Sequence, residues 1–255
     1  MVYRFSFVLL FVLLFVVMVP TYADGPLNGG FESGDLTGFT FTGNGSAQVL
    51  TVAQIAPLSP TEGSYFALVG NGPGDQGGSP DRATLASAYF SLSTPSTVSF
   101  DYDFLTAEFT GADSGGPSNL DTFNIRVQPV GGVAVTLAAG DTGSTLFTYI
   151  NLDHSPVTAT DGTSLIEHTG YHTGTANLMV GNYSLQFTVA DAGDNNFDSA
   201  LMIDNIRVES NAIPSTVPEP GTTLSLCSLC LMLAIASIRA VLRGQANGMS
   251  NDINK

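Results

Sequence analysis

The sequence contains no tryptophan, and its two cysteines, Cys227 and Cys230, both lie near the C-terminus. Residues 24–213 therefore form no disulfide bond, and this segment of about 190 residues needs an ordinary hydrophobic core instead. The two cysteines stand inside an apolar segment, where redox chemistry and zinc binding are unfavourable. We interpret them as packing residues, with a lipidation site as the alternative.

Basic side chains are scarce in the same segment. It contains three arginines, Arg82, Arg126 and Arg207, and 20 of the chain's 22 acidic residues, which gives a net charge of −17. Nucleic acid is excluded as a partner because phosphate binding needs a basic surface. Crowded carboxylates repel one another, which favours either a bound cation or a highly solvated surface, and both interpretations stay open here.

Catalytic signatures are absent from the sequence. It contains no HExxH, GxSxG, Walker or Rossmann glycine pattern. His168 and His172 have the spacing of a zinc-binding helix, but Gly170 lies between them and the surrounding sequence is typical of strands. Paired carboxylates for glycoside hydrolysis stay open because their separation is a three-dimensional quantity. We predict that the protein is not an enzyme.

Apolar and polar residues alternate with a period of two along residues 24–213. The alternation is strict at residues 98–104, 123–127 and 185–189, which predicts half-buried strands. Shorter candidate strands occur at residues 47–52, 65–69, 83–92, 133–138 and 147–152. Clusters of Gly, Pro, Asn and Asp separate these windows, and no helical apolar stripe is present. We therefore predict an all-β fold, an antiparallel β-sandwich of jelly-roll type.

The last predicted strand changes register. Leu201 and Ile203 are two residues apart and face the same side of a strand, whereas Ile206 is three residues beyond Ile203 and would face the opposite side. The inward face therefore changes between Asp204 and Asn205. One extra residue in a strand has this effect. The sequence therefore predicts a β-bulge that re-aims the side chains of these two residues.

The N-terminus has the pattern of a signal peptide. Arg4 precedes an apolar run over residues 5–19, and a small residue, Ala23, follows a proline at position 20. Fifteen residues at ~1.5 Å each reach roughly 22 Å, which is less than the ~30 Å hydrocarbon core. We therefore predict a cleaved signal peptide, residues 1–23, rather than a permanent transmembrane helix.

A second apolar segment lies near the C-terminus, at residues 222–238, and Arg239 and Arg243 follow it. Its length is at the lower limit of a membrane-spanning helix, and distal arginines hold that end in the cytoplasm. The predicted order is a signal peptide (1–23), a β domain (24–213), a Pro-rich linker (214–221), a transmembrane sorting helix with a basic end (222–243) and a polar tail (244–255).

The segment VPEPGTTLSLCSLCLMLAIASIRAVLR resembles the PEP-CTERM sorting signal of exosortase-bearing Gram-negative bacteria. Its Pro218, Glu219 and Pro220 stand directly before the apolar helix. The resemblance implies an exported protein that the inner membrane holds until an exosortase-type enzyme processes it. The cell surface or the extracellular matrix is then its residence. A plain membrane anchor and a GPI signal are the alternatives, although a GPI signal ends in its apolar tail.

The opening LNGGFESGDLTGFTFTGN, residues 27–44, resembles the start of galactose-binding-like and carbohydrate-binding jelly rolls. These domains commonly begin Asn-x-x-Phe-Glu-x-Gly and close with an aliphatic-Asp-Asn-aliphatic strand, which is present here at residues 203–206. The resemblance implies a structural calcium ion between the first and last strands, with Glu32 and Asp204 as ligands. A surface Glu32 and a turn-forming Asp204 are the alternative.

The loop at residues 191–199 is a second candidate for calcium. Asp191, Asp194 and Asp198, with two asparagines, offer enough oxygen atoms for an ion without the spacing of an EF-hand. The same residue types are ordinary turn formers, so a solvated loop is the alternative.

These features together predict a non-catalytic, exported surface or extracellular-matrix protein with a calcium-stabilised β-sandwich. The first alternative is a carbohydrate-binding module for an extracellular polysaccharide, and a polysaccharide-active enzyme is the second. The lack of tryptophan weighs against sugar binding, which commonly uses exposed aromatic rings. The tyrosines that could replace it are Tyr65, Tyr89, Tyr149, Tyr171 and Tyr183.

Overall fold

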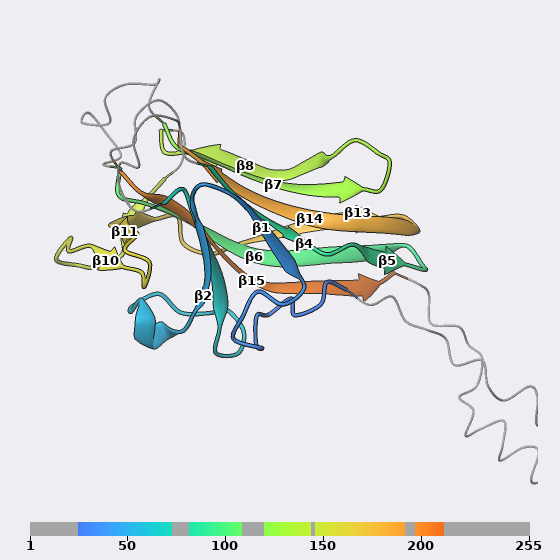
Figure 1. The fold of residues 1–255 in the computed structure, drawn as a ribbon, viewed down its shortest axis with the longest axis horizontal. Coiled ribbons are helices and arrows are strands. Elements are labelled where there is room, and N and C mark those ends of the chain that lie inside the picture. Colours follow the sequence, from blue (N-terminus) through green and yellow to red (C-terminus); the bar gives the residue numbers. More distant parts are fainter. Residues whose placement is uncertain (1–24, 73–81, 109–119, 144–145, 192–196, 212–255) are drawn as a thin grey trace, which may run out of the picture. The chain divides into compact units, whose positions relative to one another are not determined.

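Two antiparallel sheets pack face to face in the structure (Figure 1). The computed structural model describes residues 25–72, 82–108, 120–143, 146–191 and 197–211. Within these ranges the one helical element is a 3-10 turn, η1, at Val52–Gln54. The predicted all-β, antiparallel sandwich is therefore confirmed.

Sheet A has the strand order β1-β4-β14-β7-β8, and β5 also pairs with β14. All of its neighbouring strands are antiparallel. Its strands are β1 (Phe39–Gly43), β4 (Arg82–Ser87), β5 (Phe90–Leu92), β7 (Thr122–Pro129), β8 (Val135–Asp141) and β14 (Gly181–Ala190).

Sheet B has the order β2-β3-β15-β6-β12-β9, and β13 also pairs with β6. Its strands are β2 (Ser46–Leu50), β3 (Phe66–Gly70), β6 (Ser96–Thr106), β9 (Thr148–Tyr149), β12 (Glu167–His168), β13 (His172–Leu178) and β15 (Ser199–Ser210). A separate hairpin joins β10 (Val157–Thr158) to β11 (Ser164–Leu165). The chain crosses repeatedly between the sheets, for example from β5 to β6 and from β14 to β15, as in a jelly roll.

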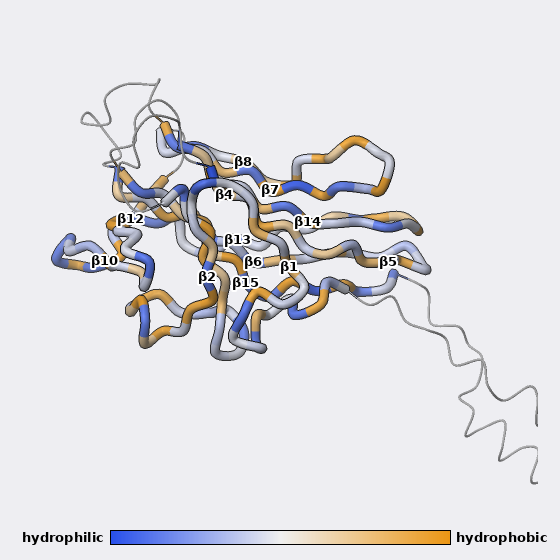
Figure 2. The backbone as a smooth tube through the Cα atoms, viewed as in Figure 1, coloured by the Kyte–Doolittle hydropathy of each residue, from blue (hydrophilic) through white to orange (hydrophobic). Residues whose placement is uncertain are grey.

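Side chains from the inner faces of both sheets form the main core. In β7, Phe123, Ile125 and Val127 are buried, and the polar residues between them are exposed or half-buried. Figure 2 shows the same alternation as a change between hydrophobic and hydrophilic colours along this strand. Phe100 of sheet B packs edge-on against Phe187 of sheet A, with ring centroids 5.7 Å apart. Each buried side chain of this size contributes about 1.5–3 kcal/mol.

The outer face of sheet B carries a second apolar cluster. Phe66 and Leu68 of β3 and Met202 of β15 point away from the main core and pack with Ile55 and Leu58. Loop residues therefore cover this part of sheet B, and both faces of β3 are buried. The outer face of sheet A has no such layer of large apolar side chains among the described residues, because its outward side chains on β4, β7 and β14 are polar residues or alanines.

Most predicted strands are present, with some changes at their ends. Residues 98–104, 123–127 and 185–189 lie inside β6, β7 and β14, as predicted. The window at residues 83–92 forms two strands, β4 and β5, because the chain turns between them. The window at residues 147–152 was too long, since only β9 is a strand there.

The predicted membrane segments fall outside the described residues. These segments are the signal peptide at residues 1–23 and the sorting helix at residues 222–243, with the Pro-Glu-Pro motif before it. Within the ranges that the structure describes, no helix has the length and hydropathy needed to cross a bilayer. Export and sorting therefore stay predictions from the sequence.

Candidate functional site

The predicted β-bulge is present in β15. The pairing of β15 with β6 shifts between Asp204 and Arg207, and Asn205 has a φ of 56°. Asparagine tolerates this left-handed conformation better than most residues. The bulge directs the Asn205 side chain toward Asp101, whose Oδ2 accepts a hydrogen bond from Asn205 Nδ2 at 2.8 Å. The bulge thus binds the last strand to its neighbour through side chains as well as the backbone.

Asp204, one of the two predicted calcium ligands, is fully buried beside a loop at residues 61–65. Its Oδ2 accepts hydrogen bonds from the backbone N–H groups of Thr61 and Glu62, at 2.7 and 2.9 Å, and from the Thr61 hydroxyl. Its Oδ1 accepts the N–H of Asn205 at 2.7 Å. Burial raises the pKa of Asp204, although the backbone hydrogen bonds oppose this shift. The carboxylate therefore acts as an anchor for the loop.

Glu32, the other predicted ligand, contacts the same loop. Its Oε1 accepts hydrogen bonds from the backbone N–H groups of Ser64 and Tyr65, at 2.9 and 3.0 Å. Gly63 lies between the residues that donate to Asp204 and those that donate to Glu32. Its φ is +64°, and a Cβ atom at this position would stand 2.2 Å from the Glu32 carboxylate. The loop thus joins the beginning of the domain to its last strand. We call residues 61–65 the tether loop.

The geometry around these two carboxylates gives little support to a calcium ion. Four donors already occupy the oxygens of Asp204, and both carboxylates bind N–H groups of the tether loop. Calcium needs six to eight oxygen ligands. Across the described ranges, no group of three or more His, Cys, Asp and Glu side chains is arranged to hold a metal ion. The calcium site at Glu32 and Asp204 stays a prediction.

The second predicted calcium loop is described only in part. Asp194 lies outside the described residues, whereas Asp191 and Asp198 are buried. Asp198 Oδ2 accepts a hydrogen bond from the backbone N–H of Ser164 at 2.7 Å, which fastens the β10–β11 hairpin to the start of β15. This contact gives Asp198 a structural role, and the second calcium site also stays a prediction.

The histidines do not form a zinc site in the described residues. His168 Nδ1 lies 2.7 Å from Asp103 Oδ2, and His172 contacts the ring of Tyr102. His168 and His172 belong to different strands, β12 and β13, because the chain turns at Gly170. The hydrogen bond to Asp103 raises the pKa of His168.

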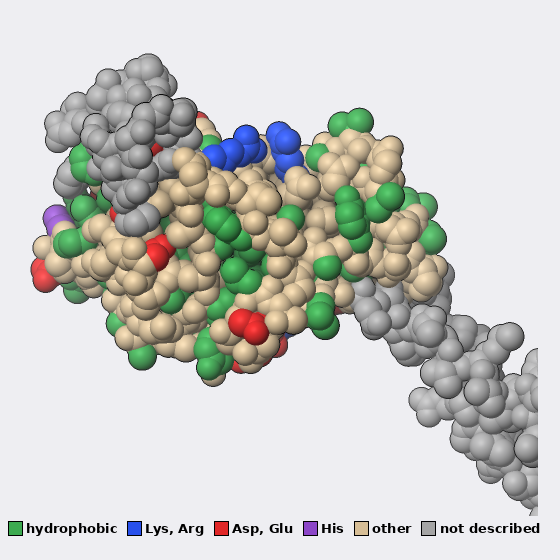
Figure 3. Space-filling model, in the orientation of Figure 1, with side chains coloured by type: hydrophobic (Ala, Val, Ile, Leu, Met, Phe, Trp, Pro, Cys, Tyr) green, Lys and Arg blue, Asp and Glu red, His purple; other side chains and the backbone are tan. Residues whose placement is uncertain are grey.

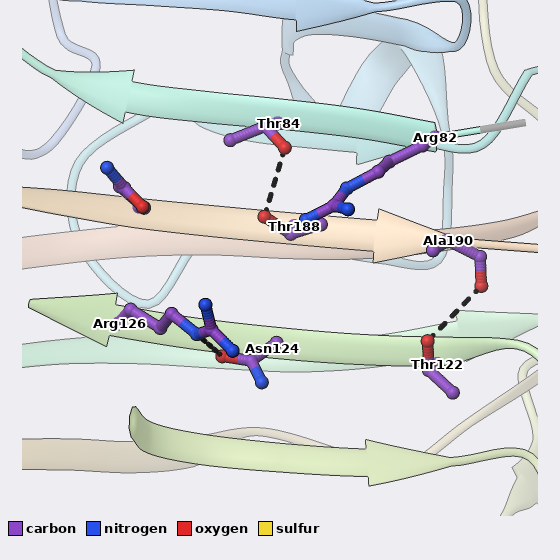
Figure 4. Close-up of a pocket in the computed structure, with 8 residues that line it drawn as sticks. Arg82, Thr84, Thr122, Asn124, Arg126, Thr188 and Ala190 are labelled. Atoms are coloured by element: carbon purple, nitrogen blue, oxygen red, sulfur yellow. Dashed lines mark hydrogen bonds between the residues drawn. The ribbon is translucent and has the colours of Figure 1, made fainter. Parts of the chain in front are cut away.

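A polar groove lies on the outer face of sheet A. Gln186 of β14 pairs with Arg126 of β7, and Thr188 pairs with Thr84 of β4 on one side and with Asn124 on the other. Their side chains point outward because the residues between them fill the core. The groove encloses about 240 Å³ and is lined by Arg82, Thr84, Thr122, Asn124, Arg126, Gln186, Thr188 and Ala190 (Figure 4). We call these eight residues the arginine groove.

Hydrogen bonds order several side chains of the arginine groove. Arg126 Nε donates to Asn124 Oδ1 at 2.9 Å, and the hydroxyls of Thr84 and Thr188 lie 3.0 Å apart (Figure 4). The Arg82 side chain extends over β14 toward Thr188 in the same view. The groove thus presents guanidinium, amide and hydroxyl groups together, all of which donate hydrogen bonds.

The arginine groove contains two of the three arginines of the β domain. Figure 3 shows basic side chains gathered in one part of the visible surface. The third arginine, Arg207, forms an ion pair with Glu62 at 2.8 Å. None of the eight groove residues is acidic. The sequence supplied all of these residue types, but their assembly depends on pairing between distant strands.

The tyrosines do not supply an aromatic platform in the arginine groove. Tyr89, Tyr149 and Tyr171 are exposed, but none of them lines the groove. Tyr149 stacks on His154, and the Tyr171 hydroxyl donates to the Ser59 carbonyl at 2.7 Å. Recognition in this groove therefore depends on polar groups rather than on ring stacking.

Comparisons by sequence give no match. No protein-family model matches the chain, and no curated protein is similar to it.

Comparisons of the fold find β-sandwich domains. TmCBM61 in complex with β-1,4-galactotriose has 13% identity and a TM-score of 0.43, and the alignment covers 74% of this chain and 100% of that one. A cleaved adhesin domain of Lys-gingipain from Porphyromonas gingivalis has 11% identity and a TM-score of 0.45, with coverage of 72% and 96%. CBM28, a carbohydrate-binding module specific for non-crystalline cellulose, has 15% identity and a TM-score of 0.38, with coverage of 74% and 97%.

Proposed function

We propose that the β domain binds an extracellular polysaccharide in the arginine groove and has no catalytic activity. The observation that carries this proposal is the groove itself, an open polar surface built from β4, β14 and β7. The corresponding face of sheet B is covered by an apolar cluster. Sheet A therefore offers the surface on which an extended ligand has room to lie.

The groove chemistry suits a ligand with many hydroxyl groups. Asn124 and Gln186 each carry an acceptor oxygen and a donor NH2 group, and the threonine hydroxyls act in both roles. A sugar ring presents hydroxyls that need partners of both kinds. Because no aromatic ring lines the groove, hydrogen bonds rather than stacking would provide the affinity.

The lack of an acidic residue in the groove supports a binding role rather than hydrolysis. Glycoside hydrolysis commonly needs two carboxyl groups on either side of the scissile bond. The eight groove residues include no aspartate or glutamate. A polysaccharide held there would meet no pair of carboxylates from these residues.

The predicted targeting segments fit this proposal. A signal peptide at residues 1–23 would export the chain, and exosortase-type processing near Pro218, Glu219 and Pro220 would release it from the inner membrane. The cell surface and the extracellular matrix, where the processed chain would then reside, are places where polysaccharides occur. A calcium ion bound by Glu32 and Asp204 would add stability and is not needed for the groove.

The proposal is tested by titrating soluble polysaccharides, such as galactan, xylan and polygalacturonate, onto the immobilised full-length chain. We expect saturable binding of at least one polymer. Replacing both Asn124 and Gln186 with alanine should weaken this binding about 5- to 150-fold, because each of the two hydrogen bonds contributes about 0.5–1.5 kcal/mol. Asn177→Ala on β13, in the other sheet, is the control and should bind normally. Equal binding by the double variant would contradict the proposal.

A further inference from the structure

We infer that the arginine groove selects acidic polysaccharides, whose carboxylate or sulfate groups pair with Arg82 and Arg126. This inference rests on the proposed function and specifies its ligand class. It starts from the distribution of charge, because the β domain carries 20 acidic residues and three arginines. Two of these three arginines lie in one groove without an acidic neighbour in its lining.

The two groove arginines differ from the third in their partners. Arg207 is paired with a carboxylate, Glu62. Within the described ranges neither Arg82 nor Arg126 forms an ion pair, although the domain is rich in Asp and Glu. Two guanidinium groups held near each other repel one another, and a bound anion relieves this repulsion. A neutral polymer would offer these two charges no counterion.

The arrangement of the two arginines suits a chain with repeated charges. Arg82 and Arg126 lie on the two strands that flank β14. Arg82 pairs with Ala190 of β14 and Arg126 pairs with Gln186, so the two arginines are offset by four residues along the strands. Strand spacing of ~4.8 Å and a rise of ~3.4 Å per residue put their Cα atoms roughly 17 Å apart. Their backbones therefore stand at opposite corners of the groove, and both side chains extend inward, Arg82 toward Thr188 and Arg126 toward Asn124 (Figure 4). A polymer with acidic groups at intervals can contact both.

The geometry of Arg126 also favours an anion that offers two neighbouring oxygen atoms. Its Nε donates to Asn124 Oδ1, which fixes the plane of the guanidinium. The other N–H groups of this side chain have no hydrogen-bond partner in the described part of the chain and are available to a ligand. Carboxylates and sulfates accept two parallel hydrogen bonds from such a group. Lysine would supply the charge without this geometry.

The test compares polymers that differ only in charge. Polygalacturonate and its fully methyl-esterified form share one backbone, and the immobilised full-length chain is titrated with both. We expect the acidic form to bind at least tenfold more tightly. Arg82→Gln and Arg126→Gln should each weaken binding of polygalacturonate about fivefold, as for a partly exposed ion pair. Both substitutions should weaken binding of the ester less than binding of polygalacturonate, because the ester has no charge to pair with the guanidinium groups.

Arg207→Gln is the matched control, because it makes the same change in net charge outside the groove. It should bind polygalacturonate as the wild-type chain does. Arg126→Lys separates charge from geometry and should recover only part of the lost affinity. Dextran sulfate with and without these substitutions shows whether sulfate groups use the same two arginines.

Each remaining outcome has a definite meaning. If no polysaccharide binds, the proposed function fails together with this inference. If the ester binds as tightly as the acid and the arginine variants bind normally, the groove binds sugars but does not select acidic ones. If poly-glutamate binds as tightly as polygalacturonate, the groove is a general polyanion site and the inference is wrong. Equal losses in Arg207→Gln and the groove variants would show an effect of net charge alone.

Discussion

Replacing Asp204 with alanine should destabilise the domain through the tether loop. The substitution removes the acceptor of the backbone N–H groups of Thr61, Glu62 and Asn205. A buried donor without a partner costs about 1–3 kcal/mol. Because Thr61 and Glu62 are themselves exposed, water replaces part of each bond, and we take the lower end, about 1 kcal/mol for each N–H. The expected loss is therefore about 3 kcal/mol.

Urea unfolding of the wild-type chain and of Asp204→Ala, followed by circular dichroism, measures this loss. It is a large fraction of the 5–15 kcal/mol by which domains are commonly stable. Asp35→Ala is the control, since Asp35 accepts hydrogen bonds from Ser33 and Thr37 in an exposed turn and its removal should change the unfolding midpoint little. A loss below about 1 kcal/mol for Asp204→Ala would refute the assignment of Asp204 as the anchor.

Three further predictions concern the same domain. The contact with Asp103 raises the pKa of His168. The free energy of unfolding that this contact contributes is therefore fully present below the unfolded pKa near 6.5 and is lost as the pH rises through the folded pKa. His168→Gln should remove this pH dependence from unfolding curves measured between pH 5 and 9, and a pH dependence equal to that of the wild-type chain would contradict the assignment. Gly63→Ala should lower stability by at least about 1 kcal/mol, because its Cβ would meet the Glu32 carboxylate at a positive φ; an unchanged urea midpoint would exclude this strain. Calcium should raise the thermal midpoint of the wild-type chain but not of Glu32→Ala if the predicted ion binds only the folded state; equal midpoints with calcium and with EDTA would remove the calcium site from the account.

The strand pattern was predictable from local sequence because side chains alternate across a half-buried sheet. The same rule identified the bulge, since the change of parity between Ile203 and Ile206 needs an extra residue at Asp204 or Asn205. The rule also assigned Arg126 and Gln186 to an outer face. It did not assign them to one groove, because β7 and β14 are about 60 residues apart along the chain and only tertiary structure pairs them.

The role of Asp204 was predicted only in part. The resemblance implied that Asp204 joins the two ends of the domain through a calcium ion shared with Glu32, which stays a prediction, and the structure shows both carboxylates against the tether loop. The sequence interpretation used a calcium ion for that connection, whereas the structure shows N–H groups of the tether loop. No local pattern could reveal this, since Thr61 and Asp204 are 143 residues apart.

The free face of sheet A also required the structure. A continuous apolar run in β3 indicates burial on both faces, and Phe66 and Leu68 do pack beneath loops outside sheet B. The loops that cover them have no strong signal in the sequence. Because the sequence does not place these loops, the sequence alone could not tell which of the two sheets has an outer face that a ligand can reach.

The most direct test of the central claim is a titration of the isotope-labelled full-length chain with polygalacturonate fragments, followed by NMR of side-chain amides. We predict that the NH2 signals of Asn124 and Gln186 shift and saturate together, while those of Asn177 on sheet B stay in place. Shifts confined to residues outside sheet A, or no shift at concentrations where the polymer binds, would contradict the assignment of the arginine groove as the binding site.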